Sequence, residues 1–100
     1  MYNLKITQSF YPGGKVMSSP IIEIDCHGMK AEQAVKAVEA KVKSAGKETY
    51  RIRVIHGFHG GTAIRDAIKR ELGYGLQEKI LRIENGSNQG VTDLILREYY

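Results

Sequence analysis

Two short runs in the chain combine side chains that can move protons with glycines that let a ligand approach the backbone. The first run, Asp25-Cys26-His27-Gly28, places a carboxylate and an imidazole two positions apart. In extended backbone, Asp25 and His27 share one face and Cys26 takes the other. A carboxylate fixes the tautomer of a neighbouring imidazole, which suits a general acid or base. The alternative is a plain turn, in which Asp25 caps the backbone and His27 bonds within the loop.

The second run covers residues 56–62 and is rich in glycine. Gly57, Gly60 and Gly61 lead into a predicted helix whose N-cap is Thr62, and free amides at a helix start favour a phosphate. The glycines would equally serve a tight strand-to-helix turn. The run lacks the Gly-Lys-Ser/Thr ending of a Walker loop and is not G-x-G-x-x-G, so we do not expect nucleotide hydrolysis.

The three histidines, His27, His56 and His59, invite comparison with a metal site because imidazole is a common zinc ligand. The H-x-x-H spacing in a glycine loop fixes no common coordination geometry, and Cys26 is expected to face away as a small buried apolar residue. We therefore predict no cofactor, with a divalent metal as the alternative, and we assign His56 as a second proton carrier.

The elements that position these residues follow from hydrophobic periodicity. Short β-branched runs predict strands, and apolar positions at three-and-four spacing predict helices. The predicted order is βαβαββ, with strands at 21–25, 50–55, 79–83 and 91–96, helices from about 31 to 45 and 62 to 72, and a hairpin loop at 85–90.

A strand, a helix and a second strand in one sheet almost always form a right-handed crossover with parallel strands. The segments that follow the first three strands, residues 25–28, 56–61 and 85–90, should then emerge at one edge of the sheet. Ligands of open α/β sheets bind at this edge. The two runs that carry histidines and glycines, residues 25–28 and 56–62, are thus predicted to meet.

Composition limits the classes of protein that fit. The chain has 100 residues, one cysteine and a net charge of +4, so a disulfide framework is excluded and an anionic partner is favoured. The apolar stretches are too short for a membrane helix, and the start of the chain lacks the pattern of a signal peptide. We expect a cytoplasmic protein with an N-terminal arm at 1–19 and one domain at 20–100.

Basic side chains near the predicted edge are candidates for holding phosphates. Arg51 and Arg53 alternate on one side of the second strand, and Arg65 and Lys69 are four apart on the second helix. The alternative for each is a solvated face. Tyrosines that could stack on bases, or pack at termini, are Tyr2, Tyr11, Tyr74, Tyr99 and Tyr100.

Over residues 21–97 the ordered motifs resemble the Smr domain, the small MutS-related module. Ile24-Asp25-Cys26-His27-Gly28 is similar to the family's Leu-Asp-Leu-His-Gly, with Cys26 in place of the second leucine. Val54-Ile55-His56-Gly57 matches the start of His-Gly-x-Gly-x-Gly. His59 falls at the middle glycine of this motif, and one residue is added before Arg65. Lys30 stands where a family helix often has a capping threonine.

The resemblance implies an α/β fold, more closely an α+β two-layer sandwich with a four-stranded mixed sheet, like the C-terminal domain of translation initiation factor three. It also implies an endonuclease that cleaves or nicks RNA or DNA, with the Asp-x-His motif tied to cleavage. Some family members act on messenger RNA at stalled ribosomes, which adds the ribosome as an expected partner. The alternative is a module that binds nucleic acid or the ribosome without cleaving.

Overall fold

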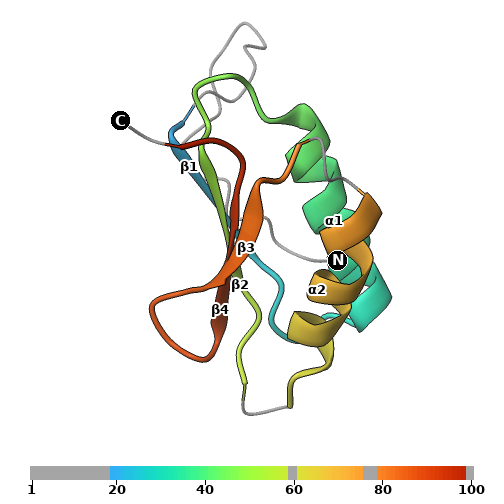
Figure 1. Cartoon of the computed structure of the whole chain (residues 1–100). Helices are drawn as coiled ribbons and strands as arrows, with labels where there is room; N and C mark the ends of the chain where they lie inside the picture. Colours follow the sequence, from blue (N-terminus) through green and yellow to red (C-terminus); the bar gives the residue numbers. More distant parts are fainter. Residues whose placement is uncertain (1–18, 59–60, 76–78, 99–100) are drawn as a thin grey trace, which may run out of the picture.

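Figure 1 shows a computed structural model of the chain, which describes residues 19–58, 61–75 and 79–98. Four strands form one sheet, and both helices cover the same face of it. The predicted order βαβαββ is confirmed. The elements are β1 (Ile21–Asp25), α1 (Ala31–Ser44), β2 (Arg51–Ile55), α2 (Ala63–Gly75), β3 (Arg82–Asn85) and β4 (Val91–Ile95).

The strand order in the sheet is β1-β2-β4-β3. β1 and β2 are parallel, and β4 is antiparallel to both β2 and β3. β1, β2 and β3 therefore point the same way, and the segments that follow them emerge at one edge, as predicted. Backbone bonds join these segments, because the Cys26 amide donates to the Ile55 carbonyl (2.7 Å) and the His56 amide donates to the Gly90 carbonyl (2.8 Å).

The core lies between the sheet and the two helices. Every second residue of β1 and β2 faces it, beginning with Ile22 and Ile52, while α1 contributes Ala34, Val38 and Val42 at helical spacing. Full burial of an isoleucine or valine side chain is worth about 1.5–3 kcal/mol, so this interface supplies the main stabilisation of the fold. In the part of the chain that is described, no helix is long and apolar enough to cross a membrane.

The third strand lies later in the chain than its sequence pattern predicts. The prediction placed it at 79–83 and put Asn85 in the hairpin loop, whereas β3 runs from Arg82 to Asn85. Its start is set by its partner: Arg82 pairs with Ile95, the last residue of β4, so the ladder cannot begin earlier. Ile80 instead packs into the core. The start of β3 therefore depends on where β4 ends, and the sequence around residue 80 carries no information about that.

Candidate functional site

Asp25 and His27 are brought together where β1 ends. The Asp25 Oδ1 lies 2.6 Å from His27 Nδ1 and also accepts a hydrogen bond of 3.1 Å from the His27 amide. The side chain of His27 is 71% exposed. A carboxylate oxygen only accepts, so the proton between the two groups is carried by Nδ1, and Nε2 is the nitrogen that can take a proton from a ligand. The acid–imidazole pair and the capped turn are therefore both present.

Cys26 points away from this pair into the core, as the alternation predicts. Burial, with a smaller contribution from the charge of Asp25, raises the pKa of the Cys26 thiol to about 12. A thiol with this pKa stays protonated at neutral pH and is a poor nucleophile. Cys26 is an apolar side chain that anchors the backbone between Asp25 and His27 in the core.

His56 is buried, with 6% of its surface exposed, and both of its ring nitrogens contact protein groups. Nδ1 lies 2.7 Å from the Gly57 carbonyl oxygen and must donate to it, while Nε2 lies 2.8 Å from the Thr92 hydroxyl, which donates to a neutral ring. The predicted role of His56 is a second proton carrier. In this arrangement the ring instead joins the glycine turn to β4.

The glycines after β2 form a tight turn. Gly57 has a φ of +75° and Gly61 a φ of +103°, values that side chains rarely tolerate. Their amides are engaged within the protein, because Gly57 donates to the Gly90 carbonyl (3.0 Å) and Gly61 donates to the Phe58 carbonyl (3.0 Å). Two of the amides predicted to hold a phosphate thus have protein partners. Gly60 and His59 lie outside the described residues.

The turn also sits against the first motif. A Cβ added to Gly57 would lie 3.7 Å from the Cβ of His27, so the turn passes His27 with room for about one methyl group between them. The predicted meeting of the two runs is confirmed at the level of the backbone.

Thr62 precedes the first residue of α2, as predicted for an N-cap. Its hydroxyl donates to Asp66 Oδ2 (2.8 Å), and this bond, with the charge of Arg65, holds the pKa of the Asp66 carboxyl below its usual range. An ionised Asp66 complements the positive end of the helix dipole. The first turn of α2 therefore carries a negative charge of its own close to the predicted phosphate site.

Arg51 and Arg53 lie on the face of the sheet that the helices leave uncovered, and both contact Asp93. Arg51 donates to Asp93 Oδ2 (2.5 Å), and Arg53 Nε lies 3.5 Å from the other oxygen of this carboxylate. The Asp93 side chain is only 4% exposed. Arg51 is at the start of β2, roughly 13 Å from its end at 3.3 Å per residue, so it is remote from His27.

Two of the predicted phosphate-binding residues are on α2. Arg65 contacts the neighbouring Asp66 (3.3 Å), and the Lys69 ammonium lies 3.4 Å from Asn85 Oδ1, where β3 ends. Lys69 therefore lies beside the third segment of the predicted edge. Arg51 and Arg53 are held by an acid on another surface.

One aromatic side chain near the site was missed. Phe58 directly follows Gly57 and is 43% exposed, an unusual exposure for a side chain of this size. An exposed aromatic ring can stack on a base where a protein binds single-stranded nucleic acid. The signal in the sequence is a large aromatic residue within a glycine-rich loop, outside the apolar stripes of the predicted helices and strands. The tyrosines named for stacking are all outside the described side chains.

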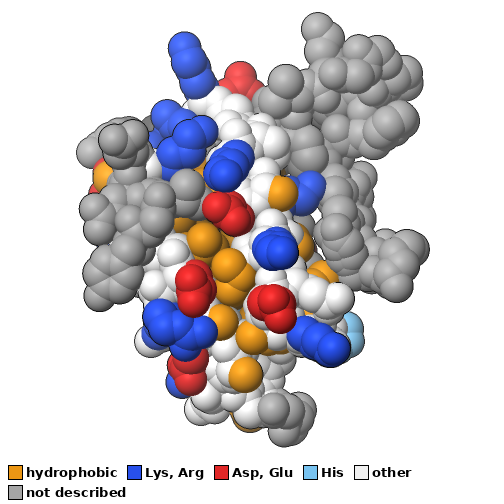
Figure 2. Space-filling model, turned by 90° about the vertical axis from the view of Figure 1, so that its right-hand side faces the viewer, with side chains coloured by type: hydrophobic (Ala, Val, Ile, Leu, Met, Phe, Trp, Pro, Cys, Tyr) orange, Lys and Arg blue, Asp and Glu red, His pale blue; other side chains and the backbone are white. Residues whose placement is uncertain are grey.

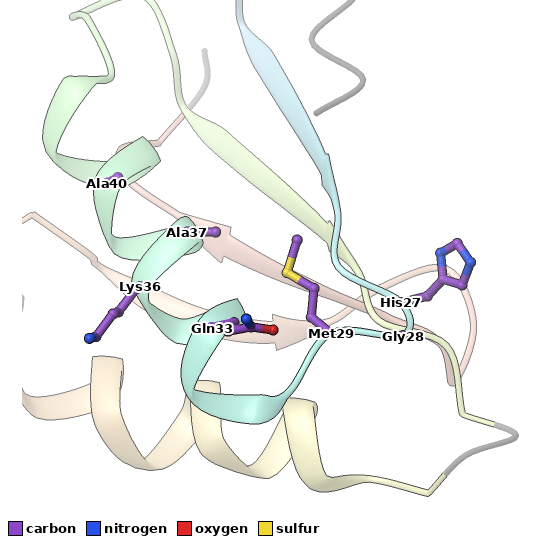
Figure 3. A pocket seen from close by; sticks show the side chains of 7 residues that line it. All are labelled: His27, Gly28, Met29, Gln33, Lys36, Ala37 and Ala40. Carbon is purple, nitrogen blue, oxygen red and sulfur yellow. The ribbon is translucent and has the colours of Figure 1, made fainter. Parts of the chain in front are cut away.

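A groove of about 640 Å³ opens beside His27 and extends along α1 (Figure 3). Met29 and Ala37 turn toward each other in this view, whereas Lys36 extends away from them. The remaining lining residues are Gly28, Gln33 and Ala40. Sequence patterning did not predict this groove, since its residues come from a loop and from one helix face. Among the described residues, no three acidic, cysteine or histidine side chains gather into a metal-binding cluster.

Figure 2 views the molecule from the helical side. Basic and acidic side chains alternate over this face, with hydrophobic side chains between them. Mixed charges do not form a field of one sign, so this view offers no extended basic surface among the described residues.

A two-layer sandwich with this strand order is the fold class that these elements define. In a search of solved structures the chain is similar to the Smr domain of Thermus thermophilus MutS2, with a TM-score of 0.63 and 24% sequence identity over 76% of this chain and 98% of that one. The chain thus has the fold of an Smr domain, as its motifs predicted. No family model and no curated protein matches the sequence.

Proposed function

We propose that this protein is an Smr-type endonuclease that cleaves single-stranded RNA or DNA, with His27 as the catalytic base. The observation that supports the proposal best is the 2.6 Å contact between Asp25 and an imidazole that is largely exposed. Asp25 fixes the tautomer and stabilises the imidazolium that forms. His27 Nε2 is then available to the substrate beside the Gly57 turn.

With RNA, His27 Nε2 removes the proton of the 2′-hydroxyl as its oxygen attacks the adjacent phosphorus. The bond between phosphorus and the 5′-oxygen breaks, and solvent protonates the leaving oxygen. The products are a 2′,3′-cyclic phosphate and a 5′-hydroxyl end. The reaction needs no metal, because the imidazole supplies the base. With DNA, which has no 2′-hydroxyl, the same base would activate water.

In this mechanism His56 is a positioning residue rather than a proton carrier. Its bonds to Gly57 and Thr92 hold the turn that lies against His27. Lys69 and Arg65 lie on α2, where their positive charges would attract the phosphates of a bound nucleic acid. The expected partners are RNA or DNA, with the ribosome as a further one.

A second candidate is a module that binds nucleic acid without cleaving it. It is favoured by a specific observation: the amides of Gly57 and Gly61, which would stabilise charge developing on phosphate, donate to protein carbonyls. Such a module would show an affinity that falls steeply with salt and would yield no product.

The test uses end-labelled single-stranded RNA and DNA of one sequence, incubated with and without EDTA. We expect the wild type to cleave RNA in EDTA, His27→Ala to be slower by about 10²–10⁴-fold, and Asp25→Asn to be slower by about tenfold. Lys47→Ala, an exposed change beyond α1, serves as the control and should match the wild type. Equal cleavage by all four proteins would eliminate the assigned roles. Salt-dependent binding without product would favour the second candidate.

A further inference from the structure

The turn after β2 carries an exposed aromatic ring close to the catalytic imidazole. Among the described residues two large hydrophobic side chains are exposed, Phe58 at 43% and Leu81 at 55%. Exposure alone does not mark a site, because single apolar side chains are common on protein surfaces. Phe58 differs from Leu81 in its position and in how firmly its backbone is held.

The position of Phe58 follows from its neighbour in the chain. A Cβ on Gly57 would lie 3.7 Å from the His27 Cβ, so the Cα of Phe58, one residue on, lies within about 9 Å of that atom. A nucleotide spans a comparable distance from its phosphate to the far side of its base. Leu81 lies at the opposite end of the sheet, because its amide donates to the carbonyl of Ile95, the last residue of β4.

The backbone of Phe58 is tied on both sides. Before it, the Gly57 amide donates to the Gly90 carbonyl (3.0 Å), and the Gly57 carbonyl lies 2.7 Å from His56 Nδ1. The carbonyl of Phe58 itself accepts a hydrogen bond from the Gly61 amide (3.0 Å). An aromatic side chain has two rotatable bonds, so a ring on a fixed backbone loses little conformational freedom when a ligand binds.

We propose that the ring of Phe58 stacks on the base next to the phosphate on which His27 acts. This inference rests on the proposed function and adds a residue that selects the substrate. Every base has a flat face, so stacking tolerates any sequence. In a duplex both faces of a base are covered by its neighbours, and the base must be extruded to meet the ring. Phe58 therefore favours single strands and loops over duplexes.

The chain has no tryptophan, so one introduced indole reports on its own surroundings. Phe58→Trp keeps an aromatic ring at the proposed contact, and Leu81→Trp is the matched control at the other exposed position. The probes are a uridine decamer with methylated 2′-hydroxyls, which His27 cannot cleave, and a decamer of the same backbone without bases. We expect the uridine decamer to quench the emission of Phe58→Trp severalfold more than that of Leu81→Trp, and the decamer without bases to quench neither.

Phe58→Leu keeps an apolar side chain but removes the flat ring. By fluorescence anisotropy with fluorescein-labelled probes, it should bind the uridine decamer about tenfold more weakly than wild type, with little change for the decamer without bases or in Leu81→Ala. Equal affinities of Phe58→Leu and wild type for the uridine decamer, or equal quenching at the two positions, would overturn the stacking while leaving the proposed function in place. A wild type that binds neither decamer would overturn both. Circular dichroism checks that each variant is folded.

Discussion

At the scale of single residues, two histidines with similar sequence surroundings have opposite environments. His27 follows β1 and is exposed, whereas His56 follows β2 and is buried against Thr92. Each comes directly or almost directly after a strand and precedes a glycine. What separates them is the number of neighbouring strands: β1 is an edge of the sheet, while β2 is flanked by β1 and β4.

This difference predicts that the same substitution destabilises the protein much more at position 56 than at position 27. His56→Ala should lower the free energy of unfolding by about 2–4 kcal/mol, because it leaves a cavity and two unpaired polar groups at Gly57 and Thr92. His27→Ala removes only an exposed contact with Asp25 and should cost less than about 1 kcal/mol. Urea unfolding of both variants measures the contrast. Similar losses of unfolding free energy in the two variants would show that the bonds of His56 to Gly57 and Thr92 do not stabilise the fold.

The thiol of Cys26 supplies a second prediction at this scale. Its pKa is about 12 in the folded protein and near 9.0 in an unfolded chain, so the folded state binds more protons between these values. Stability should therefore decline as pH rises from about 9 toward 12, with a shallower decline in Cys26→Ala. Urea titrations at several alkaline pH values test the slope. Rapid reaction of the native thiol with a disulfide reagent at pH 8 would contradict the burial.

Among the residues, sequence reasoning found the Asp25–His27 pair and the apolar role of Cys26, because alternation along a strand fixes their sides. It could not assign His56, since the partners of that ring come from β4, 36 positions along the chain. The prediction for Arg51 and Arg53 rests on their charge and their alternation along the strand. Their engagement with Asp93 depends on strand pairing, which is not visible in the local sequence.

At the scale of elements, the hairpin between β3 and β4 supports the turn that follows β2. The Gly90 carbonyl accepts hydrogen bonds from the amides of His56 and Gly57. The hairpin is itself closed tightly, because the Gly86 amide donates to the Val91 carbonyl (2.9 Å). The shape of the candidate site thus depends on an element that contributes none of its reacting groups.

Two glycines, Gly86 and Gly73, differ in whether there is room for a side chain, and this predicts opposite effects of alanine on stability. A Cβ at Gly86 would overlap the Val91 side chain, so Gly86→Ala should cost about 1–3 kcal/mol of stability. Gly73 lies in α2 with no atom within 4 Å of an added Cβ, so Gly73→Ala should stabilise by about 0.5–1 kcal/mol. Thermal unfolding of the two variants checks the opposite signs. Shifts of the same sign would refute this account of the hairpin.

Most elements could be predicted, because their periodicity is strong and their ends carry local signals. β1 has the predicted bounds, and α2 begins directly after the predicted cap at Thr62. β3 was displaced because Arg82 must pair with Ile95. The groove along α1 was not predicted at all, since it depends on how Met29 lies against the helix.

At the scale of the whole molecule, positive charge is divided between two surfaces. The sheet face without helices holds Arg51 and Arg53 against a buried Asp93, while Lys36 and Lys69 lie on the helices. The net charge of +4 therefore overstates what is available to a polyanion at the candidate site.

This division makes stability and affinity respond to different residues. Arg51→Ala should lower stability by about 1.5–3 kcal/mol, because Asp93 then loses a charged hydrogen-bond partner while it stays buried. The affinity of this variant for a fluorescein-labelled uridine decamer should stay within about twofold of wild type. In 0.1 M salt, exposed charges more than about 10 Å apart interact only weakly, and Arg51 is farther than this from His27. Urea unfolding and anisotropy measure the two quantities. A large loss of affinity in folded Arg51→Ala would place nucleic acid on the sheet face instead.

The position of β4 between β2 and β3 has a consequence for the protein as it is being made. This strand is the last of the four to leave the ribosome, yet it occupies the interior of the sheet and carries the partners of His56 and Arg51. A nascent chain that ends before residue 91 would leave β2 and β3 without their shared neighbour. Any cutting activity would then be withheld during synthesis and would begin only when translation has passed this point.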